Sequence, residues 1–312
     1  KNLVTKTNVT SRWIEGGFMN IDDQTWVSIS TTQTNFKNAS VFISLPNIPG
    51  ENSTNGYPAI ARVRQVVRSG QVSFQAKIYQ ANDSFCSKQW RIPVAISPPL
   101  EVSWLVVENG VYSILNQYTV MIGRGPITRQ DSSVTNANNF VRFNYPTGCV
   151  TSTDSCKFSG DVNNVALIMQ LQTTVYDRIL IPRGRAITLT FARLVLQPHD
   201  STVMSYYTMT SPETLSYLAY TGGMSVNCIE GLTLEGSIFT GVTNKKVTVP
   251  FKYTYLAPPG VFGAIGSSIS LTDSTGLRVF DRTTSNAALI TQEDQCVDQE
   301  TDHTTGEVVF NS

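Results

Sequence analysis

The sequence is poor in charge and in long apolar runs, and each shortage excludes a class of protein. Only 15% of the 312 residues are charged, and the 23 basic side chains balance the 23 acidic ones. A nucleic-acid-binding protein needs a surplus of Lys and Arg against the phosphates, so no nucleic acid is predicted as a partner. No stretch of about 18 consecutive apolar residues occurs, so no membrane span is predicted.

Histidine and cysteine are also scarce, which leaves little for catalysis or metal binding. His199 and His303 each adjoin an aspartate, but neighbours on a strand point to opposite faces. No nucleophile elbow, phosphate loop or zinc motif occurs, so we predict a protein that is not an enzyme and has no cofactor. Cys149 and Cys156 flank a polar, turn-rich stretch. Their spacing predicts a local disulfide in an oxidising compartment, and two reduced thiols are the alternative.

Alternation of apolar and polar residues is abundant instead. It extends over residues 72–78, 187–192 and 247–255, whereas residues 104–107 form a continuous apolar run typical of a strand covered on both faces. Turn dipeptides such as Asn-Gly and Gly-Gly follow these runs, and no amphipathic helix of about twelve residues is indicated. The sequence therefore predicts an all-β protein made of antiparallel sandwiches.

A repeat of roughly 100 residues divides the chain, which is the length of a tandem domain and not of a solenoid unit. Residues 103–110 align with 216–223, and each segment follows a proline break, an alternating strand and a short apolar strand. A third copy extends from residue 261 to 310. We predict three sandwiches, over residues 23–115, 116–223 and 224–312.

The first 22 residues carry a strand that this division leaves over. Residues 13–21 match the closing strand at 106–114, whereas the third copy stops before the end of its own closing strand. This pattern predicts a donor strand that completes the third sandwich of the next molecule. A fragment of a longer array and closure within one chain are alternatives. The residues expected to meet are Trp13, Ile14 and Phe18 of the donor and Val308, Val309 and Phe310 of the acceptor.

Several segments of the first repeat resemble the H-type lectin family, the six-stranded sandwich of snail agglutinins. The similarity covers residues 40–44, 61–63, 69–72 and 103–109 and is weaker in the other two repeats. The resemblance implies a six-stranded antiparallel sandwich in each repeat.

The resemblance also implies a sugar site made of an arginine, a Trp-His pair and nearby loop residues. In the first repeat the arginine position falls near Pro58 and residues 79–82 replace the Trp-His pair. The third repeat matches the arginine with Arg278. The second repeat matches the arginine with Arg178 and the histidine with His199, which makes it the candidate for carbohydrate binding although it lacks the stacking tryptophan.

Modification and calcium are the remaining sites that the sequence indicates. An acidic segment at 293–302 offers carboxylates to calcium, and a solvated loop is the alternative. In a secretory compartment, N-linked glycans are expected at four sequons. The calcium candidates are Glu293, Asp294 and Asp298, and the sequons are at Asn8, Asn38, Asn52 and Asn82.

Together these features predict an extracellular or cell-surface protein with a structural role. We expect it to assemble head to tail into a filament or surface array, as a homopolymer joined by strand complementation. The alternative is a multivalent lectin or adhesin, in which weak carbohydrate sites gain avidity from repetition.

Overall fold

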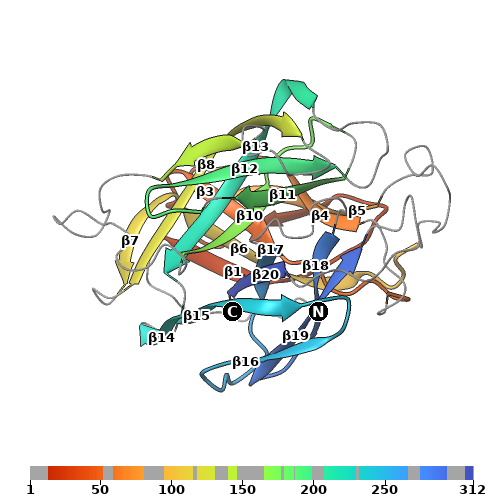
Figure 1. Ribbon diagram of the computed structural model, residues 1–312, viewed down its shortest axis with the longest axis vertical. Coiled ribbons are helices and arrows are strands. Elements are labelled where there is room, and N and C mark those ends of the chain that lie inside the picture. Colours follow the sequence, from red (N-terminus) through yellow and green to blue (C-terminus); the bar gives the residue numbers. More distant parts are fainter. Residues whose placement is uncertain are drawn as a thin grey trace.

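The computed structural model describes residues 13–51, 59–80, 95–114, 118–130, 140–145, 165–176, 179–185, 187–198, 207–221, 223–229, 232–265, 275–293 and 306–311. Within these ranges every regular element is a β-strand, from β1 to β20 (Figure 1). No helix in this part of the chain is long and apolar enough to cross a membrane. The prediction of an all-β protein is confirmed.

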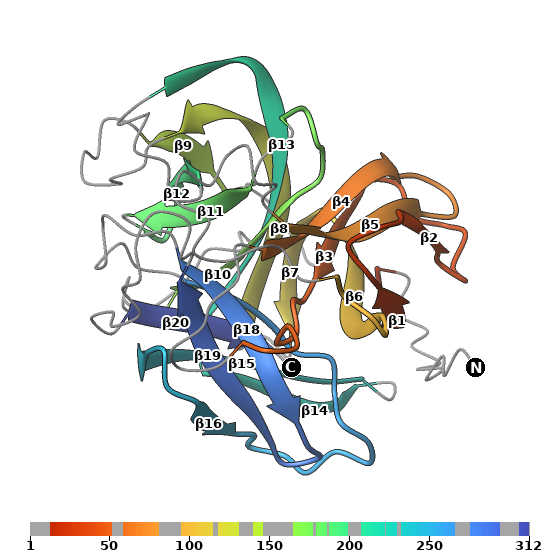
Figure 2. The ribbon, with the colours of Figure 1, turned by 90° about the vertical axis from the view of Figure 1, so that its right-hand side faces the viewer.

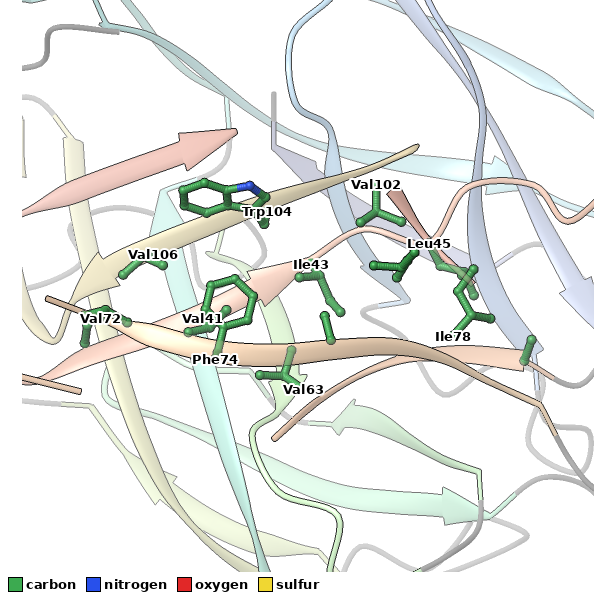
Figure 3. Close-up of a cluster of buried hydrophobic side chains, with 14 of the residues drawn as sticks. Val41, Ile43, Leu45, Val63, Val72, Phe74, Ile78, Val102, Trp104 and Val106 are labelled. Atoms are coloured by element: carbon green, nitrogen blue, oxygen red, sulfur yellow. The ribbon is translucent and has the colours of Figure 1, made fainter. Parts of the chain in front are cut away.

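The first sandwich consists of two three-stranded antiparallel sheets around one apolar core (Figure 3). Val41 and Trp104 from one sheet meet Phe74 from the other. Every second side chain of β5 is buried, as its alternation predicts. The first sheet has the order β1 (Ile14–Ile21), β6 (Leu100–Glu108), β3 (Ala39–Ile43), and the second has the order β2 (Val27–Ser30), β5 (Ser73–Gln80), β4 (Ala59–Val67).

The second sandwich has the same strand order, but its two sheets are continuous. The long strand β8 pairs with β13 along most of its length and meets β12 at its last residue, where Gln130 lies beside Leu196. The first set of strands is β8 (Tyr118–Gln130), β13 (Tyr207–Thr221) and β10 (Val165–Leu171), and the second is β9 (Val141–Asn144), β12 (Phe191–Pro198) and β11 (Leu180–Arg185).

The third sandwich repeats this order once more. Val249, Val279 and Leu289 contribute to its core. One sheet has the order β15 (Leu232–Val242), β20 (Gly306–Asn311), β17 (Phe262–Ile265), and the other has the order β16 (Val247–Pro250), β19 (Asn286–Glu293), β18 (Thr275–Arg282).

Two additional strands join one sandwich to the next. The chain leaves β6 and forms β7 (Gly110–Ile114), which pairs with β8 of the second sandwich. It leaves β13 and forms β14 (Met224–Ile229), which pairs with β15 of the third. Each connecting strand thus extends the sheet of the sandwich that follows it.

The three sandwiches are grouped around one another (Figure 2), and side chains from all three form a shared apolar core. Phe42 of the first, Ile168 and Tyr220 of the second and Phe262 of the third belong to one buried cluster. These side chains lie on the sheet faces that point away from each sandwich's own core. Because the outer faces bury one another, the described chain forms one body.

The expectation of an unpaired strand before residue 22 is wrong for the described part of that segment. Strand β1 pairs along its whole length with β6 of the same chain, from Ile14 opposite Val107 to Ile21 opposite Leu100. Its true counterpart is the opening strand β15, because Glu15-Gly16 corresponds to Glu235-Gly236 and β15 pairs with β20 as β1 pairs with β6. The first sandwich therefore begins at β1.

The third sheet is also complete where an open acceptor was expected. Strand β20 is central in its sheet, with Val309 opposite Ile238 of β15 on one side and Ala264 of β17 on the other. Both of its edges are occupied, so no edge of β20 is open to a donor strand.

Two alternating segments form shorter strands than predicted. Strand β16 ends at Pro250, and the backbone N–H groups of Lys252 and Tyr253 donate to the Glu235 carboxylate at 2.6 and 2.7 Å instead of to a neighbouring strand. Similarly, residues 187–190 precede β12 as a turn, in which the Thr188 N–H donates to the Phe191 carbonyl at 2.9 Å. At both positions hydrogen bonds outside the sheet take the place of strand pairing: bonds to the Glu235 carboxylate at the first and a local turn at the second.

Candidate functional site

The predicted donor residues are engaged inside their own chain. Trp13 stacks on Tyr112 with ring centroids 4.5 Å apart, and Ile14 is 4% exposed. The guanidinium of Arg282 lies 4.4 Å from the ring centroid of Phe18. The three side chains therefore hold the first sandwich against its neighbours, which corrects the assignment of an intermolecular interface. The backbone of residues 308–310 is paired on both sides, and their side chains are outside the described part of the structure.

One carried-over sugar residue is a buried structural arginine. Arg278 is 2% exposed, and its Nε donates to both carboxylate oxygens of Glu51 at 3.1 and 3.2 Å. It is the fourth residue of β18, as Arg62 is of β4 and Arg183 of β11, and all three are buried. The strand register therefore places Arg278 with these arginines, although it matches the arginine position of the family's sugar site.

Most other predicted site residues lie outside the described ranges. This applies to Arg178 and His199, to Cys149 and Cys156, and to the side chain of Glu293. Asn38 is described and exposed, so a glycan attached there would reach solvent. Among the described residues no group of His, Cys, Asp and Glu side chains could hold a metal ion. The other residues outside the described ranges are Asn8, Asn52, Asn82, Asp294 and Asp298.

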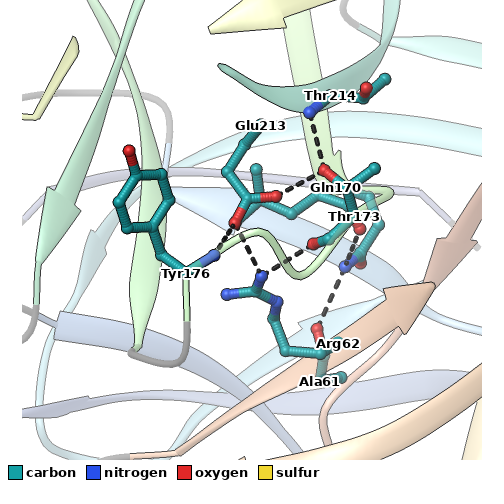
Figure 4. Close-up of polar contacts among 8 residues, drawn as sticks. Ala61, Arg62, Gln170, Thr173, Tyr176, Glu213 and Thr214 are labelled. Carbon is teal, nitrogen blue, oxygen red and sulfur yellow. Dashed lines mark hydrogen bonds and ion pairs between the residues drawn. The ribbon is translucent and has the colours of Figure 1, made fainter. Parts of the chain in front are cut away.

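The junction between the first and second sandwiches is organised by a buried ion pair (Figure 4). Arg62 Nη2 donates to Glu213 Oε1 at 3.2 Å and to the Thr173 carbonyl at 2.7 Å. The same carboxylate accepts from the Tyr176 N–H at 3.0 Å and from the Thr173 hydroxyl. Because Arg62 and Glu213 are 1% and 0% exposed, each needs the other to offset the loss of water.

Amide side chains complete the same junction by covering the free edge of β3. Gln172 Oε1 accepts from the Val41 N–H at 3.1 Å, and its Nε2 donates to the Val41 carbonyl at 2.6 Å. Ser216 Oγ donates to Ser40 Oγ at 2.9 Å. The glutamine thus replaces a neighbouring strand, so this sheet edge is not open to another chain.

The junction between the third and first sandwiches combines backbone and side-chain contacts. Besides the pair of Arg278 and Glu51, the Val279 N–H donates to the Leu45 carbonyl at 3.0 Å. Arg282 forms an ion pair with Glu101 and donates to the Pro259 carbonyl at 3.0 Å. Each of these arginines comes from the third sandwich, and each glutamate comes from the first.

Two equivalent carboxylates tie loops to the opening strands. Glu15 accepts from the N–H groups of Thr32 and Gln33 at 2.7 and 2.9 Å, as Glu235 does from the corresponding pair in the third sandwich. A carboxylate that accepts two backbone N–H groups forms strong, charge-assisted bonds. Glu15 and Glu235 therefore position equivalent loops in the first and third sandwiches, a shared feature that alternation alone did not reveal.

Sequence reasoning missed the buried arginines as a set, although a signal was present. Each arginine is the fourth residue of the equivalent strand in its sandwich. An alignment of these three strands would therefore have shown that the arginine recurs. The carboxylate partners of Arg62 and Arg278 come from distant parts of the chain, and no pattern in the sequence indicates them.

Comparisons of this chain with protein-family models, with curated proteins and with solved structures find no match.

Proposed function

We propose that this protein is a non-enzymatic, extracellular binding module of the lectin or adhesin type, built from three H-type-lectin-like sandwiches. The observation that supports it is the threefold repetition of one strand order in a single body. Each unit has six strands in two three-stranded sets, which is the architecture that the family resemblance implies.

The arrangement suits multivalent binding. The sandwiches share a core and are held by buried ion pairs, so the three units keep fixed relative orientations. Weak sites that engage one surface at the same time gain affinity without new contacts, provided that their spacing fits the ligand. Repeated carbohydrate is a ligand class of this kind, and residues Arg178 and His199 of the second sandwich are its proposed contacts.

The filament hypothesis lacks the strand exchange on which it depended. Both the donor strand β1 and the acceptor strand β20 are paired within the chain, so head-to-tail assembly would need other surfaces. A homopolymer stays a prediction, and the lectin-type function takes precedence because it requires no free strand.

A glycan array probed with the intact protein tests the proposal. We expect binding to a restricted set of glycans and at least a tenfold loss of signal in Arg178→Ala and in His199→Ala. Arg142→Ala is the matched control, because Arg142 also belongs to the second sandwich but stacks on Phe191, 3.9 Å from its ring centroid. Absence of binding by the intact protein, or equal binding by all variants, would contradict the proposed function.

A further inference from the structure

Two arginines converge at the junction of the first and second sandwiches, and no carboxylate of the described residues forms an ion pair with either of them. Arg68 follows the end of β4, and Arg124 lies in β8 opposite Ser216. Both Nη1 atoms donate to one oxygen, the Ala39 carbonyl, at 3.2 and 3.3 Å. The two nitrogens are therefore no further apart than these two distances combined, and two positive charges share one neutral acceptor.

The other arginines at the junctions differ from this pair. Arg62, Arg278 and Arg282 each face a glutamate. Arg68 and Arg124 take part in no ion pair within the described part of the chain, and the second acceptor of Arg68 is the neutral Gln172 Oε1 at 3.4 Å. A guanidinium has five N–H donors, so donors on Nε and Nη2 of both residues are left without a described protein acceptor.

The position is electrostatically unfavourable for two cations. Burial, together with the charge of Arg124, lowers the pKa of Arg68 to about 10, and burial lowers the pKa of Arg124. Both side chains still carry a proton at neutral pH. Half-buried like charges at close range are destabilising unless a counter-charge occupies the space between them.

A β-bulge directs one of these side chains toward the junction. The pairing of β4 with β5 shifts between Arg64 and Val67, and Gln65 has a positive φ of 50°. A non-glycine residue in this conformation is strained and persists where the surrounding structure requires it. The bulge lies directly before Arg68 and changes the direction in which the chain leaves the strand.

We infer that Arg68 and Arg124 form an oxyanion-binding site between the first and second sandwiches, with a sulfate, phosphate or carboxylate group as its ligand. The planar, forked donors of two guanidinium groups match the oxygens of such a group, and the negative charge neutralises the pair. Both arginines are partly exposed, so solvent and ligand can reach them. This site goes beyond the proposed function, because it does not involve Arg178 or His199.

Thermal unfolding in sodium sulfate and in sodium chloride at equal ionic strength tests the site. Sulfate stabilises proteins in general by exclusion from their surface, so the measured quantity is the extra rise in Tm over that common effect. We expect a larger rise for the unmodified protein than for Arg68→Gln and Arg124→Gln. Arg64→Gln is the matched control, since Arg64 lies near Arg68 but stacks on Trp26 and bonds to Gln75. It should keep the full rise.

Equal rises in all four proteins would overturn the inference. Should a glutamine variant fail to fold, as judged by circular dichroism, Arg68→Lys and Arg124→Lys keep the charge but lose the forked donors, and a reduced rise is expected of them. Calorimetric titration with a sulfated oligosaccharide and with its neutral counterpart then identifies the source of the group. Binding of the sulfated sugar assigns a glycan-borne sulfate, response to free sulfate alone assigns an inorganic ion, and response to neither contradicts the site. Loss of glycan binding in Arg178→Ala leaves all these outcomes unchanged.

Discussion

Single arginines decide how the sandwiches are joined. Arg62 and Arg278 occupy equivalent strand positions, yet one reaches Glu213 of the second sandwich and the other reaches Glu51 of the first. A buried ion pair adds little compared with an apolar pair of the same size, but removing one partner leaves a charge without compensation. These pairs therefore contribute mainly to the specificity of the junctions, because a wrong junction would bury the charges unpaired.

Replacement of Glu51 by alanine tests this role. Glu51→Ala removes the carboxylate from the buried Arg278, so we expect the free energy of unfolding to fall by about 3–5 kcal/mol. Asp281→Ala is the control. Its pair with Lys246 spans 3.9 Å between side chains that are 62% and 46% exposed, and such pairs contribute about 1 kcal/mol or less. Urea unfolding measures the free energy of unfolding of both variants. Equal decreases would show that the buried pair matters no more to stability than the exposed one.

Glycines make room for tyrosine rings at two positions, one at a junction and one within a sandwich. The ring of Tyr220 lies against Gly236 of the third sandwich, so a Cβ at that position would overlap it. Burial of this tyrosine raises the pKa of its hydroxyl well above the usual range. In the second sandwich Tyr217 covers Gly123 in the same manner. Small residues in one strand thus admit large ones from another.

Gly236→Ala should therefore weaken the junction of the second and third sandwiches. Overpacking of this kind costs about 1–3 kcal/mol, which urea unfolding would detect. In a double-mutant cycle with Tyr220→Ala, which removes the ring, the added methyl group should cost much less than it does alone. An equal cost in both backgrounds would place the effect in the backbone instead of in the contact.

At the scale of the strands, alternation predicted where strands occur better than which strands pair with each other. Strand β5 has the buried face that its pattern predicts, and the apolar run at 104–107 lies in the central strand β6. The match of residues 13–21 to a closing strand was misleading, because opening and closing strands of a sandwich carry similar patterns of apolar residues. The Glu-Gly pair of β1 recurs in β15, where the carboxylate again accepts hydrogen bonds from a loop, and only the structure shows that function.

At the scale of the whole molecule, the first strand is part of the core. Ile14 and Ile21 are 4% and 0% exposed. Their burial joins β1 to the first sandwich and to the core shared by all three. Whether β1 pairs within its own chain or with another molecule therefore distinguishes a self-contained body from a polymer joined by donated strands.

Ile21→Asp should destabilise the folded body severely, since it places a charge at a fully buried position. Asn20→Asp, on the exposed neighbouring residue of the same strand, should fold as the unmodified protein does. Size-exclusion chromatography, circular dichroism and negative-stain microscopy are the measurements, and compact particles are expected of the stable proteins. Filaments from the unmodified protein, together with well-folded monomers of Ile21→Asp, would restore the donor-strand hypothesis.

A candidate site could be predicted only where one short segment of the sequence contained the complete motif. Sequons are local, so Asn38 could be identified and its exposure checked. The convergence of Arg68 and Arg124 could not be predicted, because the two belong to different sandwiches and meet only at a carbonyl of a third segment. The burial of Arg278 against Glu51 could not be predicted either, because the two residues lie in different sandwiches.

The sequence by itself determined that this protein is made of β-strands, since the alternation of apolar and polar residues is a local property of each strand. It also showed that the chain is repetitive. The tertiary structure alone decided that β1 belongs to the first sandwich, that β20 is enclosed on both sides, and that three sandwiches share a core. Strand partners and ion pairs are contacts between distant segments, and many pairings satisfy the same local pattern until all surfaces are packed together.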